Sequence, residues 1–198
     1  MRERVCALMM TLALCLTACG GGAGESEAET LAQTVRSTWL AAQSCAAHLE
    51  MTADYGQRVY QFGMDLAWAK EGDTTLVLTA PESVAGVTAR IAAGETALEY
   101  DGMHLETGAL DPAGLSPVDA APAFLSYARE GFMAECVMEE VDGESRLRVA
   151  FRDPEKDPGT GTEAQIWFDP ATSAIRRGEI SSDGVTVIQC EFSDVNMG

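Results

Sequence analysis

Apolar residues along most of this chain alternate with polar ones at every second position, the pattern of a strand with one buried face. The longest such run covers residues 60–68, and its apolar positions are Tyr60, Phe62, Met64, Leu66 and Trp68. Shorter runs occupy 49–51, 76–78, 87–91, 98–105, 132–138, 147–151, 164–168, 174–181 and 185–193. Asp-Gly pairs at 101–102, 142–143 and 183–184 mark turns between neighbouring runs. The pattern therefore predicts about ten antiparallel strands joined largely by hairpins.

Two segments show the helical period of 3.6 residues instead. A first helix is predicted over residues 27–44, with Ser26 as a candidate cap and a core-facing stripe of Leu31, Val35, Trp39 and Ala42. A second is predicted over 117–129, where Ser116 is the cap and Pro117 occupies the first position. The expected fold class is mainly β with α (α+β): a single curved antiparallel sheet, an unclosed barrel, whose concave face the two helices cover.

The first residues of the chain have the layout of an export signal. A basic start, Met1-Arg2-Glu3-Arg4, precedes an apolar run over 5–16 that is too short to span a bilayer as a helix. The segment Leu16-Thr17-Ala18-Cys19 resembles the bacterial lipoprotein signal, the lipobox. That resemblance implies removal of residues 1–18 and a diacylglyceryl anchor, with palmitate-type acyl chains, on the thiol of Cys19. The expected location is a cell membrane, lipid-anchored on its extracytoplasmic side.

The acidic composition narrows the partners of the mature chain. The formal net charge is −18, and removal of Arg2, Glu3 and Arg4, which together carry +1, lowers it to −19. Such a chain is repelled by phosphate backbones, so nucleic acid is excluded as an expected partner. Residues 19–29 are small and acidic and are predicted to form a flexible tether, leaving residues 30–198 as the folded domain. The sequence leaves protein partners open.

Three cysteines remain after the signal and the anchor are set aside: Cys45, Cys136 and Cys190. An exported protein can hold disulfides, but three thiols permit at most one internal bridge. The sequence does not choose among the three pairings.

Catalytic and metal-binding motifs are absent from the sequence. The two histidines, His48 and His104, lie at polar positions of their strands and are interpreted as surface residues. The acidic loop 153–163 matches no calcium-binding spacing, and the cysteines lack the close pairs of zinc sites. No GxSxG, HExxH or phosphate-binding glycine loop is found. We therefore expect a protein that is not an enzyme and that has no metal, cofactor or catalytic residue.

The order of these features resembles a known superfamily. The residues that carry the likeness are the strand Tyr60–Trp68, the segment Leu98-Glu99-Tyr100-Asp101-Gly102 and the segment Trp167-Phe168-Asp169-Pro170, within a chain that joins a lipobox, a long helix, meandering strands and a helical crossover. In this respect the chain is similar to uncharacterised bacterial lipoproteins of the LolA/LolB-like superfamily, the outer-membrane lipoprotein carriers. The resemblance implies an unclosed barrel whose concave side, covered by helices, holds an acyl chain or another apolar ligand.

Two functions are therefore predicted, and they differ in what fills the concave side. The first is binding of a lipid or other apolar ligand, with contacts from seven side chains: Phe62, Met64, Trp68, Phe124, Tyr127, Phe132 and Met133. The alternative is a cell-surface interaction or sensing protein whose core is dry and which holds no ligand. Large side chains that fill the concave side, with no pocket of ligand size, would favour the alternative.

Overall fold

A computed structural model describes residues 22–92, 94–109 and 111–198 of the chain, so the predicted signal 1–18 and Cys19 lie outside the described residues. Its helices are α1 (Gly22–Ala41) and α2 (Pro117–Glu130). The strands are β1 (Ser44–Asp54), β2 (Val59–Ala69), β3 (Thr74–Ala80), β4 (Thr88–Ala92), β5 (Glu95–Tyr100), β6 (Met103–Ala109), β7 (Met133–Val141), β8 (Glu144–Phe151), β9 (Thr162–Phe168), β10 (Ile175–Ser182) and β11 (Val185–Met197).

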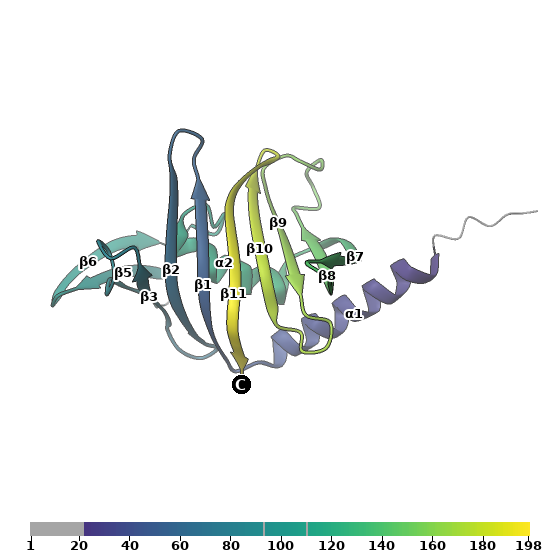
Figure 1. Ribbon diagram of the computed structural model, residues 1–198, viewed down its shortest axis with the longest axis horizontal. Coiled ribbons are helices and arrows are strands. Elements are labelled where there is room, and N and C mark those ends of the chain that lie inside the picture. Colours follow the sequence, from purple (N-terminus) through teal and green to yellow (C-terminus); the bar gives the residue numbers. More distant parts are fainter. Residues whose placement is uncertain (1–21, 93, 110) are drawn as a thin grey trace, which may run out of the picture.

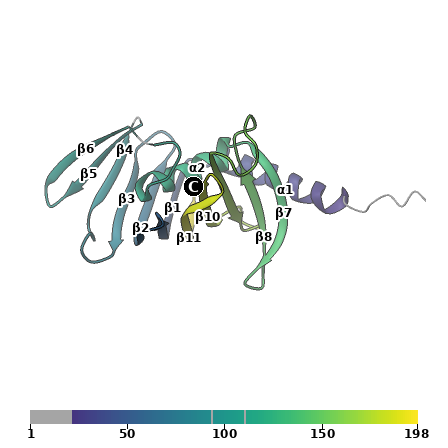
Figure 2. The same ribbon diagram turned by 90° about the horizontal axis from the view of Figure 1, so that it is seen from above.

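All eleven strands form one antiparallel sheet in the order β6-β5-β4-β3-β2-β1-β11-β10-β9-β8-β7. The chain builds one arm outward from β1 to β6 and the other arm inward from β7 to β11, and the β1–β11 pair joins the two arms (Figure 1). Helix α2 connects the two outermost strands, β6 and β7, so it must pass from one edge of the sheet to the other. Viewed from above, the sheet curves and α2 lies between its two arms (Figure 2). The predicted curved, unclosed sheet is confirmed.

The register places the alternating apolar residues on one face of the sheet. Leu66 pairs with Leu76, and the same row continues through Ala89 and Leu98 to Leu105. Directly paired residues of antiparallel strands project to the same side. Toward the other arm, Leu49 of β1 pairs with Phe192 of β11, whose ring contacts α2. This apolar face is therefore the concave one that α2 crosses.

The predicted bounds of the second helix are confirmed, and its ends are built as the sequence indicates. Ser116 is the N-cap, with its hydroxyl accepting a hydrogen bond from the Asp119 backbone N–H at 3.2 Å, and Pro117 follows it. At the other end, the backbone N–H of Gly131 donates to the Tyr127 carbonyl. Arg36 of α1 donates to the Gly131 carbonyl, which ties the two helices together at this end.

The first helix lies earlier in the chain than predicted. It begins at Gly22, inside the segment predicted as a tether, so Ser26 falls within the helix and does not cap it. It ends at Ala41, and Ser44, predicted as its last residue, begins β1. In this strand the buried residues alternate: Cys45, Ala47, Leu49, Met51 and Ala53. Small Cys and Ala side chains give a weak alternating signal, which is why the sequence predicts this strand only over 49–51. Ala28, predicted as tether, is buried.

Helix α1 covers one arm of the sheet. It packs against β7, β8 and α2, and Ala28, Ala32, Val35 and Trp39 form its buried stripe. The indole N–H of Trp39 donates to the Ser173 carbonyl at 2.9 Å, which fixes the end of α1 to the β9–β10 turn. Within the described residues, no helix is both long and apolar enough to cross a membrane.

Candidate functional site

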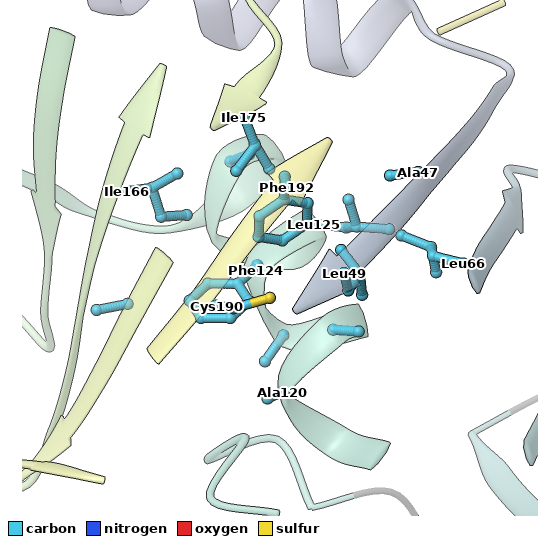
Figure 3. Close-up of a cluster of buried hydrophobic side chains, with 14 of the residues drawn as sticks. Ala47, Leu49, Leu66, Ala120, Phe124, Leu125, Ile166, Ile175, Cys190 and Phe192 are labelled. Atoms are coloured by element: carbon cyan, nitrogen blue, oxygen red, sulfur yellow. The ribbon is translucent and has the colours of Figure 1, made fainter. Parts of the chain in front are cut away.

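Helix α2 fills the middle of the concave face with side chains. Figure 3 shows Phe124 and Leu125 of α2 lying against Cys190 and Phe192 of β11. The rings of Phe124 and Phe192 meet edge to face with their centroids 5.8 Å apart, and Phe124 is fully buried. Close approach here depends on Gly178 of β10, because a Cβ at that position would lie 2.7 Å from two carbons of the Phe124 ring. The centre of the concave face is therefore packed core and has no room for a ligand.

The predicted ligand residues of β2 lie on this concave face, but two of them are covered. Met64 is fully buried, and Trp68 is half-buried with the Arg129 guanidinium of α2 above its ring, 4.9 Å from the centroid. Phe62 is half-buried and stacks with Tyr60 at 6.4 Å between centroids. Trp68 therefore lies beneath α2, whereas Met64 belongs to the packed core.

The remaining predicted residues follow the path of α2 toward the other arm. Tyr127 lies against Phe151 of β8, with ring centroids 5.8 Å apart, and burial raises the pKa of its hydroxyl. Met133 is half-buried against the core at the start of β7, whereas Phe132 just before it is 51% exposed. Five strands separate β2 from β7 in the sheet. The structure thus does not bring the seven predicted residues together around one cavity.

An apolar surface that the ligand prediction omitted lies on the opposite arm. It consists of Leu98 and Tyr100 of β5 and Met103 and Leu105 of β6, and we call these four residues the outer apolar face. Leu98 is half-buried, but Tyr100 is 50%, Met103 67% and Leu105 63% exposed. The signal for this surface was present in the sequence, because the same residues alternate on either side of the predicted Asp101-Gly102 turn.

The outer apolar face is continuous with the core. In the row that runs from Leu66 to Leu105, Leu76 and Ala89 are completely buried, and exposure rises only at Leu98 and Leu105. Both helices pack elsewhere, α1 on β7 and β8 and α2 chiefly on α1, β9 and β1. The row therefore extends beyond the helical cover, and its last two strands present apolar side chains to solvent.

The surface hollows of the described part of the chain include five with volumes of about 180 to 460 Å³. Tyr127 is the one predicted ligand residue that lines any of these five, and its hollow is the smallest. The largest, of about 460 Å³, lies at the end of the outer arm and is bordered by residues that include Arg90, Thr96, His104 and Glu106. The exposed side chains of the outer apolar face thus offer hydrophobic contact at this end of the concave side.

The three cysteines of the domain are free thiols in the structure. Burial raises the pKa of Cys45 to about 11, and it raises the pKa of Cys190 well above its ordinary value. Burial also raises the pKa of the half-buried Cys136. Thiols that are held protonated are poor nucleophiles and poor metal ligands.

The charged groups of the sheet lie mostly on its convex face. His48 of β1 has Asp65 of β2 2.7 Å from Nδ1 and Glu50 3.2 Å from Nε2. Its hydrogen bonds to Asp65 and then to Glu50 raise the pKa of the imidazole. The two carboxylates contact opposite ring nitrogens, and the described residues contain no group of three or more acidic, histidine or cysteine side chains suited to a metal ion. This cluster is therefore an ion-pair arrangement across two strands.

No protein-family model matches the chain, and no curated protein matches its sequence. Solved structures do match it. An uncharacterized conserved protein from Thermus thermophilus gives a TM-score of 0.52 at 7% identity, covering 87% of this chain and 88% of that one. LprF from Mycobacterium bovis gives 0.50 at 14% identity, covering 88% and 95%. A LolA superfamily protein from Nitrosomonas europaea gives 0.44 at 10% identity, covering 86% and 93%.

At these identities the likeness to the first two structures shows a shared fold and nothing about ligands or partners. The predicted architecture, one curved and unclosed antiparallel sheet with two helices, is confirmed.

Proposed function

We propose that this protein is an extracytoplasmic lipoprotein, anchored through Cys19, that binds a lipid or another apolar ligand on its outer apolar face. It acts as a binding protein and not as an enzyme. The observation that carries the proposal is the cross-strand row from Leu66 to Leu105, whose side chains pass from complete burial to 63% exposure without a change in apolar character. Exposed contiguous apolar surface on a folded domain marks a binding site.

The chemistry of the outer apolar face suits an acyl chain. Leu98, Tyr100, Met103 and Leu105 supply flexible and aromatic contacts without a charged group among them. Each methylene group buried there contributes about 0.8 kcal/mol. Methionine adapts to chains of different shape, which fits a surface that takes a class of lipids rather than one molecule.

The lipobox supports the anchor, which would hold the fold close to the membrane. Helix α1 begins at Gly22, so only two residues separate it from Cys19. A Cys19→Ser variant should lose incorporation of labelled palmitate and leave the membrane fraction. Retention of both by the variant would contradict the lipoprotein assignment.

Ligand binding is tested by titrating the full chain, carrying Cys19→Ser and stripped of lipid, with a fluorescent fatty acid. Leu105→Glu places a charge in the outer apolar face and should weaken binding at least about tenfold, because the favourable burial of apolar area is lost. The matched control is Val185→Glu, since Val185 is 66% exposed at the distant β10–β11 turn. Equal affinities of the two variants would overturn the proposed site.

A second candidate is supported by the packed centre of the concave face. Phe124 and its neighbours leave no ligand-sized space there, as the interaction or sensing alternative requires. Native mass spectrometry of protein purified without detergent separates the two functions. Co-purifying lipid supports the ligand-binding proposal, whereas a bare chain that also ignores the fatty acid supports the interaction protein.

A further inference from the structure

The two edges of the sheet differ in how they are protected. Strand β7 ends one side of the sheet and is packed against by α1. Strand β6 ends the other side, and among the described strands it pairs only with β5. Natural proteins protect such edges, because a row of unpaired N–H and C=O groups is a template for another strand.

Two residues of β6 have backbone groups that are free to pair with another strand. Tyr100 and Met103 pair directly across the two-residue Asp101-Gly102 turn, so they form a hydrogen-bonded pair, and the ladder alternates from there. The N–H and C=O groups of His104 and Glu106 are therefore directed away from β5. Both residues are exposed.

The sequence of β6 is complementary to itself in the antiparallel direction. If Leu105 lies opposite Leu105 of a second copy, His104 faces Glu106 of that copy, and Glu106 faces its His104. The two outward-directed residues would then form the hydrogen-bonded pairs, and Leu105 would form the closer non-hydrogen-bonded pair on the apolar side. The alignment that places Leu105 opposite Leu105 therefore satisfies the backbone hydrogen bonds, the charge pairs and the apolar contact at the same time.

The side chains of the edge are available for these contacts. Among the described residues Glu106 has no ion-pair partner, and His104 has only Glu99 of the same hairpin, 3.5 Å from its Nδ1. Met103 and Leu105 are both more than 60% exposed. Pairing of two copies would cover apolar side chains that the monomer leaves in solvent.

We infer that β6 is the interface of a two-fold symmetric dimer, in which β6 of one copy pairs antiparallel with β6 of a second copy centred on Leu105. The interface is isologous, so the His104–Glu106 contact occurs twice and the Leu105 pair lies on the two-fold axis. It brings the outer apolar faces of the two copies side by side across the shared edge.

Proximity is tested by cross-linking the full chain in the membranes of cells that express it. Leu105→Cys places two thiols opposite each other at a pair whose Cα atoms are about 4.5 Å apart, within reach of a disulfide. A mild oxidant should convert this variant to a covalent dimer. Val185→Cys, equally exposed but distant from the edge, is the collision baseline, and cross-linking of Leu105→Cys no greater than this baseline would overturn the dimer.

The register is tested by charge exchange in the Leu105→Cys background. His104→Glu places like charges opposite each other at two symmetry-related pairs and should lower the cross-linking rate about tenfold. His104→Glu combined with Glu106→Lys restores opposite charges and should restore the rate. An unchanged rate in the single variant, or no rescue in the double variant, would overturn this pairing.

These charge variants also separate the dimer from the proposed ligand site. His104 and Glu106 lie on the face opposite to Leu105, because neighbouring residues of a strand point to opposite sides. The His104→Glu variant should therefore keep its affinity for the fluorescent fatty acid within a factor of about two while losing the cross-link. The fatty-acid affinity of Leu105→Glu tests the ligand site only. The cross-linking rates of the His104 and Glu106 variants test the dimer only.

Discussion

The two arms of the sheet carry the same alternating pattern but differ in what lies over it. In the arm β7–β10, Leu147, Val149, Phe151 and Ile166 are buried beneath α1 and α2. In the arm β3–β6, burial is complete at Leu76 and has largely disappeared at Leu105. Strand amphipathicity therefore specifies which face of the sheet is apolar, whereas the helices decide whether that face is buried or exposed.

The largest expected difference in the free energy of unfolding is between alanine variants of one leucine in each arm. Leu147→Ala should lower the free energy of unfolding by about 2–5 kcal/mol, because it leaves a cavity beneath the helices. Leu105→Ala should change it by no more than about 0.5 kcal/mol, since the side chain is exposed. Urea unfolding followed by far-UV circular dichroism measures both. Similar losses in the two variants would remove the distinction between a covered and an open arm.

A smaller effect is expected where α2 touches the covered arm. Gly178→Ala adds a methyl group against the ring of Phe124 and should cost about 1–3 kcal/mol of unfolding free energy through overpacking. Phe124→Leu removes part of that ring, so a double-mutant cycle should give a coupling energy that partly rescues the alanine variant. Additive losses in the cycle would show that α2 does not rest on Gly178.

The smallest expected effect on stability comes from the ion pairs of His48 on the convex face, where β1 and β2 meet. Asp65 and Glu50 raise the pKa of His48 above its ordinary value of 6.5, so the charged imidazole stabilises the fold below that pH and the contribution is lost as the pH rises through the folded-state pKa. Asp65→Asn should shift the NMR titration of His48 toward lower pH, and by more than Glu50→Gln does. His104 supplies the second imidazole resonance of the chain as an internal comparison. An unmoved His48 titration would show that the contact with Asp65 is absent in solution.

Much of the fold could be predicted from local signals, because they act over a few residues. Asp101, Asp142 and Asp183 each adopt a positive φ of about 50° before a glycine, as the predicted hairpin turns require. Ser116 and Pro117 mark the start of α2 in the sequence and in the structure. Strand β1 was only partly predicted, since alternating Cys and Ala residues resemble a helical stretch as much as a strand.

The candidate site was predicted less well, because membership of a site depends on residues far apart in the chain. Phe124 was expected to contact a ligand, but a glycine more than fifty positions away admits its ring into the core. Phe132 and Phe62 were placed in one site, yet Phe62 lies on β2 and Phe132 just before β7, and five strands separate β2 from β7 in the sheet. Leu105 belonged to a predicted hairpin, and nothing near it in the sequence shows that both helices pack elsewhere.

Local patterns along the chain specify where the strands turn and which face of each strand is apolar. These properties depend on backbone preferences and on side chains within one element. The tertiary structure alone decided that α2 crosses the sheet and fills its centre, that α1 protects the β7 edge, and that the β6 edge stays open. Those outcomes depend on how two helices divide the area of one sheet that is wider than both of them can cover.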